Sequence, residues 1–158
     1  MCAEAPPAVH FAAVSDAAPP YAAFLGTWLL IPESCRFEQG APPRSGTERI
    51  VRNRERLRFE LSWVDASGVA EGAVFEGVPD GKPEPFAGSD LADTLVVHAV
   101  SARELTTSAF YQGKERMVAQ RQLDDTGAAM RLVQVVRFPD GETLANISVY
   151  RRAVSGPG

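Results

Sequence analysis

The sequence predicts an all-β fold, an antiparallel up-and-down β-barrel of roughly eight to ten strands. Three observations support this prediction. Short segments of alternating apolar and polar residues follow one another from residue 46 to residue 152. Tight turns that contain Gly separate these segments at a spacing of about ten residues. No segment between them has the periodicity of a helix, so we expect the strands to be joined as a meander of hairpins.

Composition indicates one globular domain. The chain has 158 residues, of which 45% are hydrophobic and 23% are charged, as is usual for a soluble protein. A net charge of −4 gives no basic surface for nucleic acid, and no apolar run approaches the roughly 20 residues of a membrane span. We expect a flexible Ala/Pro-rich tail at 1–20, a single barrel domain at 21–154 and a short tail at 155–158.

The cysteines and histidines are too few for a disulfide framework or a metal site. Cys2 and Cys35 are expected to be free thiols, which favours a reducing compartment and hence the cytoplasm. The N-terminus lacks the charged region followed by an apolar region that marks a secretory signal peptide. A signal peptide that has already been removed is an open alternative. We expect no metal and no cofactor. Nothing in the sequence indicates the oligomeric state.

The first strand is predicted at about 26–31, after a helical turn at 21–25 that would cover the end of the barrel. Gly26 allows the chain to enter the sheet tightly, and the Trp28 indole would plug the cylinder. Pro32 is expected to end this strand, and residues 33–45 to form a loop. The barrel can close if this strand pairs with the last one. Further strands are predicted at 46–53, 56–64, 69–78, 93–100, 104–111, 114–123, 129–138 and 142–152, with a short extended piece at 83–87.

Alternation shows which side chains share a face. One face of 56–64 carries Leu57, Phe59, Leu61 and Trp63, and one face of 114–123 carries Met117, Ala119, Arg121 and Leu123. Several strands have two moderately apolar faces, so polarity alone does not decide which face lies inside. A barrel of this size is either filled by side chains or holds one small ligand.

Two terminal motifs resemble the calycin group, which contains the lipocalins and the intracellular fatty-acid-binding proteins. Phe24-Leu25-Gly26-Thr27-Trp28 is similar to the G-x-W start of both families, and the final strand at 146–152 resembles the last strand of fatty-acid-binding proteins, which ends in Tyr and charged residues. The repeated D-G turns between a G-T-W start and a V-Y end are closest to uncharacterised bacterial lipocalin-like proteins. The resemblance covers about residues 24–153 and implies a barrel that binds a small hydrophobic ligand.

The resemblance also implies roles for single residues. Fatty-acid-binding proteins hold a ligand carboxylate through an Arg-x-Tyr pair on the last strand and a further Arg near the penultimate hairpins. Tyr150 matches the Tyr, Ser148 replaces the Arg of that pair, and Arg121 matches the further Arg. In lipocalins a last-strand Arg packs across the Trp of the G-x-W start. Here this would be Arg151 or Arg152 over Trp28, which closes the barrel next to Gly26. The segment at 34–45 is too short for the helix–turn–helix of fatty-acid-binding proteins.

Arg121 is the sharpest candidate for contact with a ligand. If its face points inward, the guanidinium needs a carboxylate, a phosphate or a protein partner, because burying it unpaired is costly. If the strand faces the other way, Arg121 is solvated. The residues expected to contact a ligand are Arg121, Tyr150, Trp63, Phe59, Leu61, Met117, Met130, Gln134 and Ser148. For the aromatic residues among them, packing in the core is the alternative.

No catalytic constellation is present in the sequence, which favours a binding protein for a small hydrophobic or lipid-like molecule, with an anionic head as one option. One alternative is an enzyme, an isomerase, cyclase or hydrolase that acts on a hydrophobic metabolite and uses His98 or a buried carboxylate as acid or base. A haem-binding barrel with His98 as the ligand is a second alternative. A barrel packed solid, acting as an interaction module, is a third.

Overall fold

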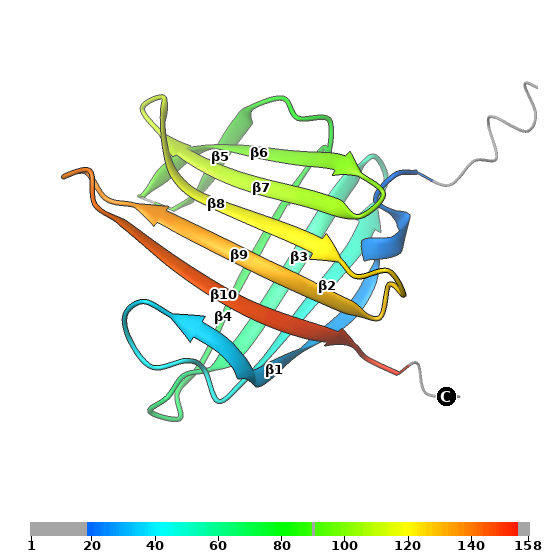
Figure 1. Cartoon of the computed structure of the whole chain (residues 1–158). Coiled ribbons are helices and arrows are strands. Elements are labelled where there is room, and N and C mark those ends of the chain that lie inside the picture. The colour runs from blue at the N-terminus through cyan, green and yellow to red at the C-terminus, as the bar shows by residue number, and fades with distance from the viewer. Residues whose placement is uncertain (1–18, 90, 155–158) are drawn as a thin grey trace, which may run out of the picture.

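Ten antiparallel strands form a single sheet that curls into a nearly closed barrel in the computed structural model (Figure 1). The structure describes residues 19–89 and 91–154, so most of the predicted tail at 1–20, with Cys2, and the tail at 155–158 lie outside the described residues. A short 3-10 helix, η1 (Ala22–Phe24), precedes the first strand. The strands are β1 (Gly26–Phe37), β2 (Ser45–Asn53), β3 (Arg56–Val64), β4 (Ala70–Gly77), β5 (Glu84–Ser89), β6 (Ala92–Ser101), β7 (Glu104–Tyr111), β8 (Lys114–Leu123), β9 (Ala129–Arg137) and β10 (Thr143–Arg152).

The predicted pairing of the first strand with the last is confirmed. The strand order is β4-β3-β2-β1-β10-β9-β8-β7-β6-β5, so the meander is closed through β1 and β10. Trp28 lies opposite Arg152, and Leu30 lies opposite Tyr150. Gly26 has a φ of +129°, and a Cβ at this position would lie 3.1 Å from the Arg152 guanidinium. A glycine therefore permits both the backbone turn and the close approach of this arginine.

The predicted end of the first strand at Ile31 was wrong, because β1 continues to Phe37. Pairing with β10 shifts register between Ile31 and Arg36. Within this bulge the Ser34 hydroxyl accepts from the Val149 N–H at 2.8 Å and donates to the Ile31 carbonyl at 2.6 Å. A side chain thus supplies the hydrogen bonds that a strand interrupted by Pro32 would lack. The predicted loop at 33–45 shortens accordingly to residues 38–44.

The barrel has two edge strands, β4 and β5, which are not paired with each other. Side chains hold one end of this seam. Arg56 on β3 forms ion pairs with Glu76 on β4 and Glu84 on β5, and Glu84 also accepts from the Val78 N–H at 3.0 Å. Gly77 lies against Val97 of β6, where an added Cβ would come within 2.7 Å of the valine side chain.

A packed core fills the half of the barrel that η1 covers. The Trp28 indole is fully buried and donates to the Phe24 carbonyl at 2.9 Å, which fixes η1 across this end of the barrel. The fully or nearly fully buried apolar side chains of this half come from the segment around η1 and from six of the ten strands: Tyr21, Phe24, Trp28, Ile50, Leu57, Phe59, Val97, Leu105 and Met130. On β3 the apolar face of the predicted alternation is the inward one, because Leu57 and Phe59 are fully buried.

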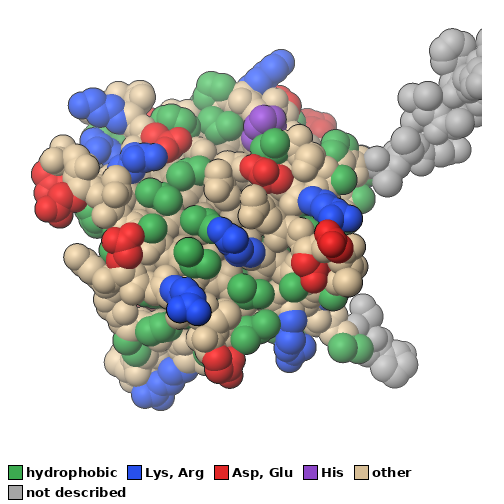
Figure 2. Space-filling view, in the orientation of Figure 1, with side chains coloured by type: hydrophobic (Ala, Val, Ile, Leu, Met, Phe, Trp, Pro, Cys, Tyr) green, Lys and Arg blue, Asp and Glu red, His purple; other side chains and the backbone are tan. Residues whose placement is uncertain are grey.

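The outer surface carries charges of both signs. Figure 2 shows Lys and Arg side chains interspersed with Asp and Glu on the visible face, with hydrophobic side chains between them. Among the residues that the structure describes, no helix has the length and hydropathy of a membrane span.

Candidate functional site

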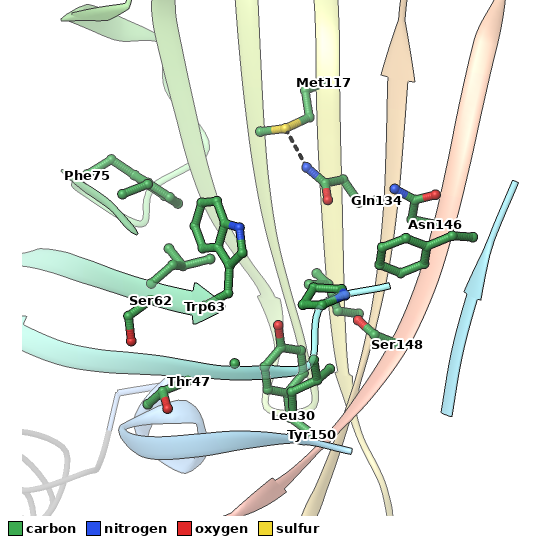
Figure 3. A pocket seen from close by; sticks show the side chains of 16 residues that line it. Leu30, Thr47, Ser62, Trp63, Phe75, Met117, Gln134, Asn146, Ser148 and Tyr150 are labelled. Carbon is green, nitrogen blue, oxygen red and sulfur yellow. Dashed lines mark hydrogen bonds between the residues drawn. The ribbon is translucent and has the colours of Figure 1, made fainter. Parts of the chain in front are cut away.

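The half of the barrel away from η1 contains a cavity of about 420 Å³ (Figure 3). It begins where the packed core ends: on β3, Leu57 and Phe59 are fully buried in the core, whereas Leu61 and Trp63 line the cavity. The lining residues are Leu30, Phe37, Pro43, Gly46, Thr47, Leu61, Ser62, Trp63, Ala73, Phe75, Met117, Leu132, Gln134, Asn146, Ser148 and Tyr150. Six of the nine predicted ligand contacts are in this set: Tyr150, Trp63, Leu61, Met117, Gln134 and Ser148.

One wall of the cavity is apolar and aromatic. Trp63 on β3 and Phe75 on β4 project from this wall (Figure 3). Trp63 lies opposite Gly46 of β2, and a Cβ at Gly46 would come within 3.3 Å of the Leu30 side chain. The absence of a side chain at residue 46 therefore leaves space beside the indole.

The other wall carries a line of polar side chains on β9 and β10. Gln134 and Asn146 are directly opposite each other on these strands, and Ser148 and Tyr150 continue the line along β10. The Gln134 amide donates to the sulfur of Met117 at 2.9 Å (Figure 3). The Asn146 side-chain oxygen is buried and has no hydrogen-bond partner within the described part of the chain.

The Tyr150 hydroxyl points in among the lining side chains (Figure 3). The residue is 9% exposed. Burial, and next the negative charge of Glu48, raise the pKa of the Tyr150 phenol well above its ordinary value. The phenol is therefore neutral at physiological pH and can both donate and accept a hydrogen bond.

Arg121 points inward but does not line the cavity. Its guanidinium donates to Glu48 at 2.6 Å and to the Thr107 hydroxyl at 2.9 Å, and it lies 4.9 Å from the centre of the Phe59 ring. A buried Arg121 was expected to need a carboxylate, a phosphate or a protein partner. The structure provides the carboxylate of Glu48. Sequence reasoning missed Glu48, because it sits in a charged stretch; its only signal was that it shares strand parity with the apolar Ile50.

Phe59 and Met130 are the other two predicted ligand contacts that the cavity does not include. Both side chains are fully buried in the packed half. The Phe59 ring stacks on Phe75 with centroids 4.8 Å apart, so Phe59 supports a lining residue from behind.

The closure of the barrel uses Arg152. Its guanidinium lies 4.2 Å from the centre of the Trp28 ring and donates to the carbonyls of Ala23, Leu25 and Gly127. Arg151 is exposed. The alternation of β10 explains the difference, because Arg152 shares the inward parity of Tyr150 and Arg151 does not.

His98 does not line the cavity. It is exposed on β6, and its backbone forms a bridge with Asp80. The haem alternative and the histidine-dependent enzyme alternative both required this imidazole inside the barrel. Within residues 19–89 and 91–154, no group of three or more His, Cys, Asp or Glu side chains is placed to hold a metal ion.

Comparisons with known proteins agree with this architecture. No protein-family model and no curated protein sequence matches the chain. The S-type phycobiliprotein lyase CPES from Guillardia theta matches at a TM-score of 0.50 and 10% identity, over 86% of this chain and 92% of the lyase. The fold is a calycin-like barrel. At this level of identity the likeness concerns the fold alone.

Two further calycin-like barrels match with lower TM-scores. Zebrafish ileal bile acid-binding protein, complexed with cholic acid, has 14% identity and a TM-score of 0.49 over 83% of this chain and 99% of its own. The lipocalin Q83, whose expression the myc oncogene activates, has 14% identity and a TM-score of 0.44 over 87% of this chain and 76% of its own.

Proposed function

We propose that this calycin-like barrel binds one small hydrophobic or lipid-like molecule in the cavity between β3, β4 and β10. The observation that carries the proposal is the contrast between the two halves of the interior. One half is packed with fully buried side chains, and the other holds a cavity of about 420 Å³. Protein interiors are normally close-packed, so a void of this size favours a guest. Its volume falls within the roughly 300–1,000 Å³ of ligand pockets.

The lining suits an apolar guest. Leu61, Trp63, Phe75, Met117 and Leu132 offer aliphatic, aromatic and thioether surface, and burial of apolar area contributes roughly 25 cal/mol per Å². The few polar groups on β9 and β10 can orient the molecule. Among the lining residues there is no His, Cys, Lys, Arg, Asp or Glu, so the cavity offers no ordinary acid, base or charged nucleophile for an enzyme.

Titration with the uncharged fluorescent probe N-phenyl-1-naphthylamine tests this proposal. Ser148 is 6% exposed and lines the cavity, so Ser148→Phe should fill part of the space, whereas Ser148→Ala should leave it open. We expect saturable binding to the native chain and to Ser148→Ala, and at least tenfold weaker binding to Ser148→Phe. Near-ultraviolet circular dichroism shows whether each variant is folded. Equal binding to a folded Ser148→Phe variant, or no binding to the native chain, would contradict the proposal.

A further inference from the structure

We propose that the cavity selects an amphiphile with an uncharged head group, such as a primary alcohol or a primary amide, over a carboxylate of the same chain length. This inference rests on the proposed binding function and names the ligand class for the same site. The anionic head that the resemblance to fatty-acid-binding proteins implies is the competing possibility, and the experiment below separates the two.

The lining of the cavity is uncharged. No side chain among the lining residues is charged, and Ser148 occupies the place on the last strand where the resemblance implies an arginine. A carboxylate moved from water into such a site would lose its hydration and gain no cation in return. An alcohol or an amide loses much less, because it carries no net charge.

Arg121 on β8 is a cation whose side chain points into the barrel. Its Nε–H donates to Glu48 at 2.6 Å and its Nη1–H donates to Thr107. Arg121 is 2% exposed and Glu48 is 0% exposed. If Arg121 turned toward a ligand carboxylate, Glu48 would remain as a buried and unpaired negative charge. The ion pair therefore removes Arg121 as an anion receptor, and its carboxylate half repels an anion.

The polar wall on β9 and β10 consists of neutral hydrogen-bonding side chains. The Asn146 oxygen is a buried acceptor without a partner among the described residues. This oxygen is not open to the cavity, and the amide nitrogen of Asn146 lies on the side of Gln134 (Figure 3). Next to it, the Gln134 amide donates to the Met117 sulfur, a weak acceptor that a ligand oxygen can replace. These amides and the hydroxyls of Ser148 and Tyr150 can exchange hydrogen bonds with a primary amide or an alcohol, but they carry no charge to balance a carboxylate.

The experiment compares three ligands with the same ten-carbon chain: 1-decanol, decanamide and decanoate, each used to displace N-phenyl-1-naphthylamine from the native chain at pH 8. We expect half-displacement at concentrations at least tenfold lower for decanol and decanamide than for decanoate. The concentration of decanoate needed for half-displacement should fall as the pH is lowered toward 5, because the pH then approaches the ordinary pKa of a carboxylic acid and more of the ligand is neutral. The concentration needed for decanol should not change.

The outcomes separate this inference from the proposed function. Decanoate that displaces the probe as well as decanol at pH 8 overturns the inference and leaves binding intact. A probe that does not bind at all overturns both. This comparison needs only the native chain, so it stands even where a variant fails to fold.

One variant then tests the charge of the lining. Gln134→Lys places a cation in the lining and should reverse the preference toward decanoate. An unchanged preference in a folded Gln134→Lys variant would overturn the inference.

Discussion

Arg121 donates to Glu48 at 2.6 Å across the interior of the barrel, and both side chains are buried. The two residues are 73 positions apart and lie on β8 and β2, which are separated in the sheet by β1, β10 and β9. The ion pair therefore joins opposite walls at the level where the packed core gives way to the cavity. With the Thr107 hydroxyl it forms a polar layer between the packed core and the cavity.

Removal of Arg121 alone should destabilise the fold strongly. Arg121→Met leaves the Glu48 carboxylate buried without its cation, and we expect a loss of about 3–5 kcal/mol in the free energy of unfolding. The double variant Glu48→Leu/Arg121→Met removes both charges and should recover most of this loss. Urea unfolding at pH 7 measures both quantities. Arg103→Met, which removes an exposed ion pair with Asp125, is the control and should change little. A single variant as stable as the native chain would refute the role of the pair.

Arg152 should matter more than its neighbour Arg151. Arg152→Ala removes the contact with the Trp28 ring and the hydrogen bonds to three backbone carbonyls, for an expected loss of about 1–3 kcal/mol. Arg151→Ala removes an exposed side chain from the same strand and should stay within about 0.5 kcal/mol of native. Thermal or urea unfolding compares the two. Equal effects would show that the stack over Trp28 contributes nothing specific.

The two tryptophans should respond differently to a ligand. Trp28 is fully buried in the packed half, whereas Trp63 is partly exposed and lines the cavity. We expect 1-decanol to shift the native emission and to protect Trp63 from acrylamide quenching. In Trp63→Phe, the remaining emission of Trp28 should be insensitive to decanol. A ligand-dependent signal that survives in Trp63→Phe would place the binding site elsewhere.

High pH should reveal the burial of Tyr150. Because burial and the Glu48 charge raise the pKa of its phenol in the folded chain, the unfolded chain loses this proton first, at its ordinary pKa of about 10. The folded state then holds more protons than the unfolded state, and the free energy of unfolding falls as the pH rises above about 10. Tyr150→Phe should remove this part of the fall. Urea unfolding between pH 8 and pH 11 tests it, and identical slopes in both proteins would contradict the assignment.

Local patterns were sufficient to predict most of the fold. Alternation predicted that Leu57, Phe59, Leu61 and Trp63 share a face, and the structure places this face inside the barrel. The glycines of the hairpin turns marked where strands end. The exception was Pro32. Its effect is offset by Ser34, whose hydroxyl bonds to Val149 of β10. That partner is distant in the sequence, so no local rule could supply it.

The site was less predictable for the same reason. Alternation placed Arg121 on one face with Met117, but the identity of its partner depends on strands that meet across the barrel. Nor does alternation show where packing stops along a strand. Phe59 and Leu61 are both inward on β3, yet only Leu61 lines the cavity, because the core side chains around Phe59 come from other strands.

A crystal structure of the chain grown with 1-decanol tests the central claim most directly. We predict difference density for the alkyl chain between Trp63 and Met117, with the hydroxyl within hydrogen-bonding distance of a polar side chain of β9 or β10 that lines the cavity. A cavity that is collapsed or filled by protein side chains, or a decanol molecule bound only on the outer surface, would contradict the account.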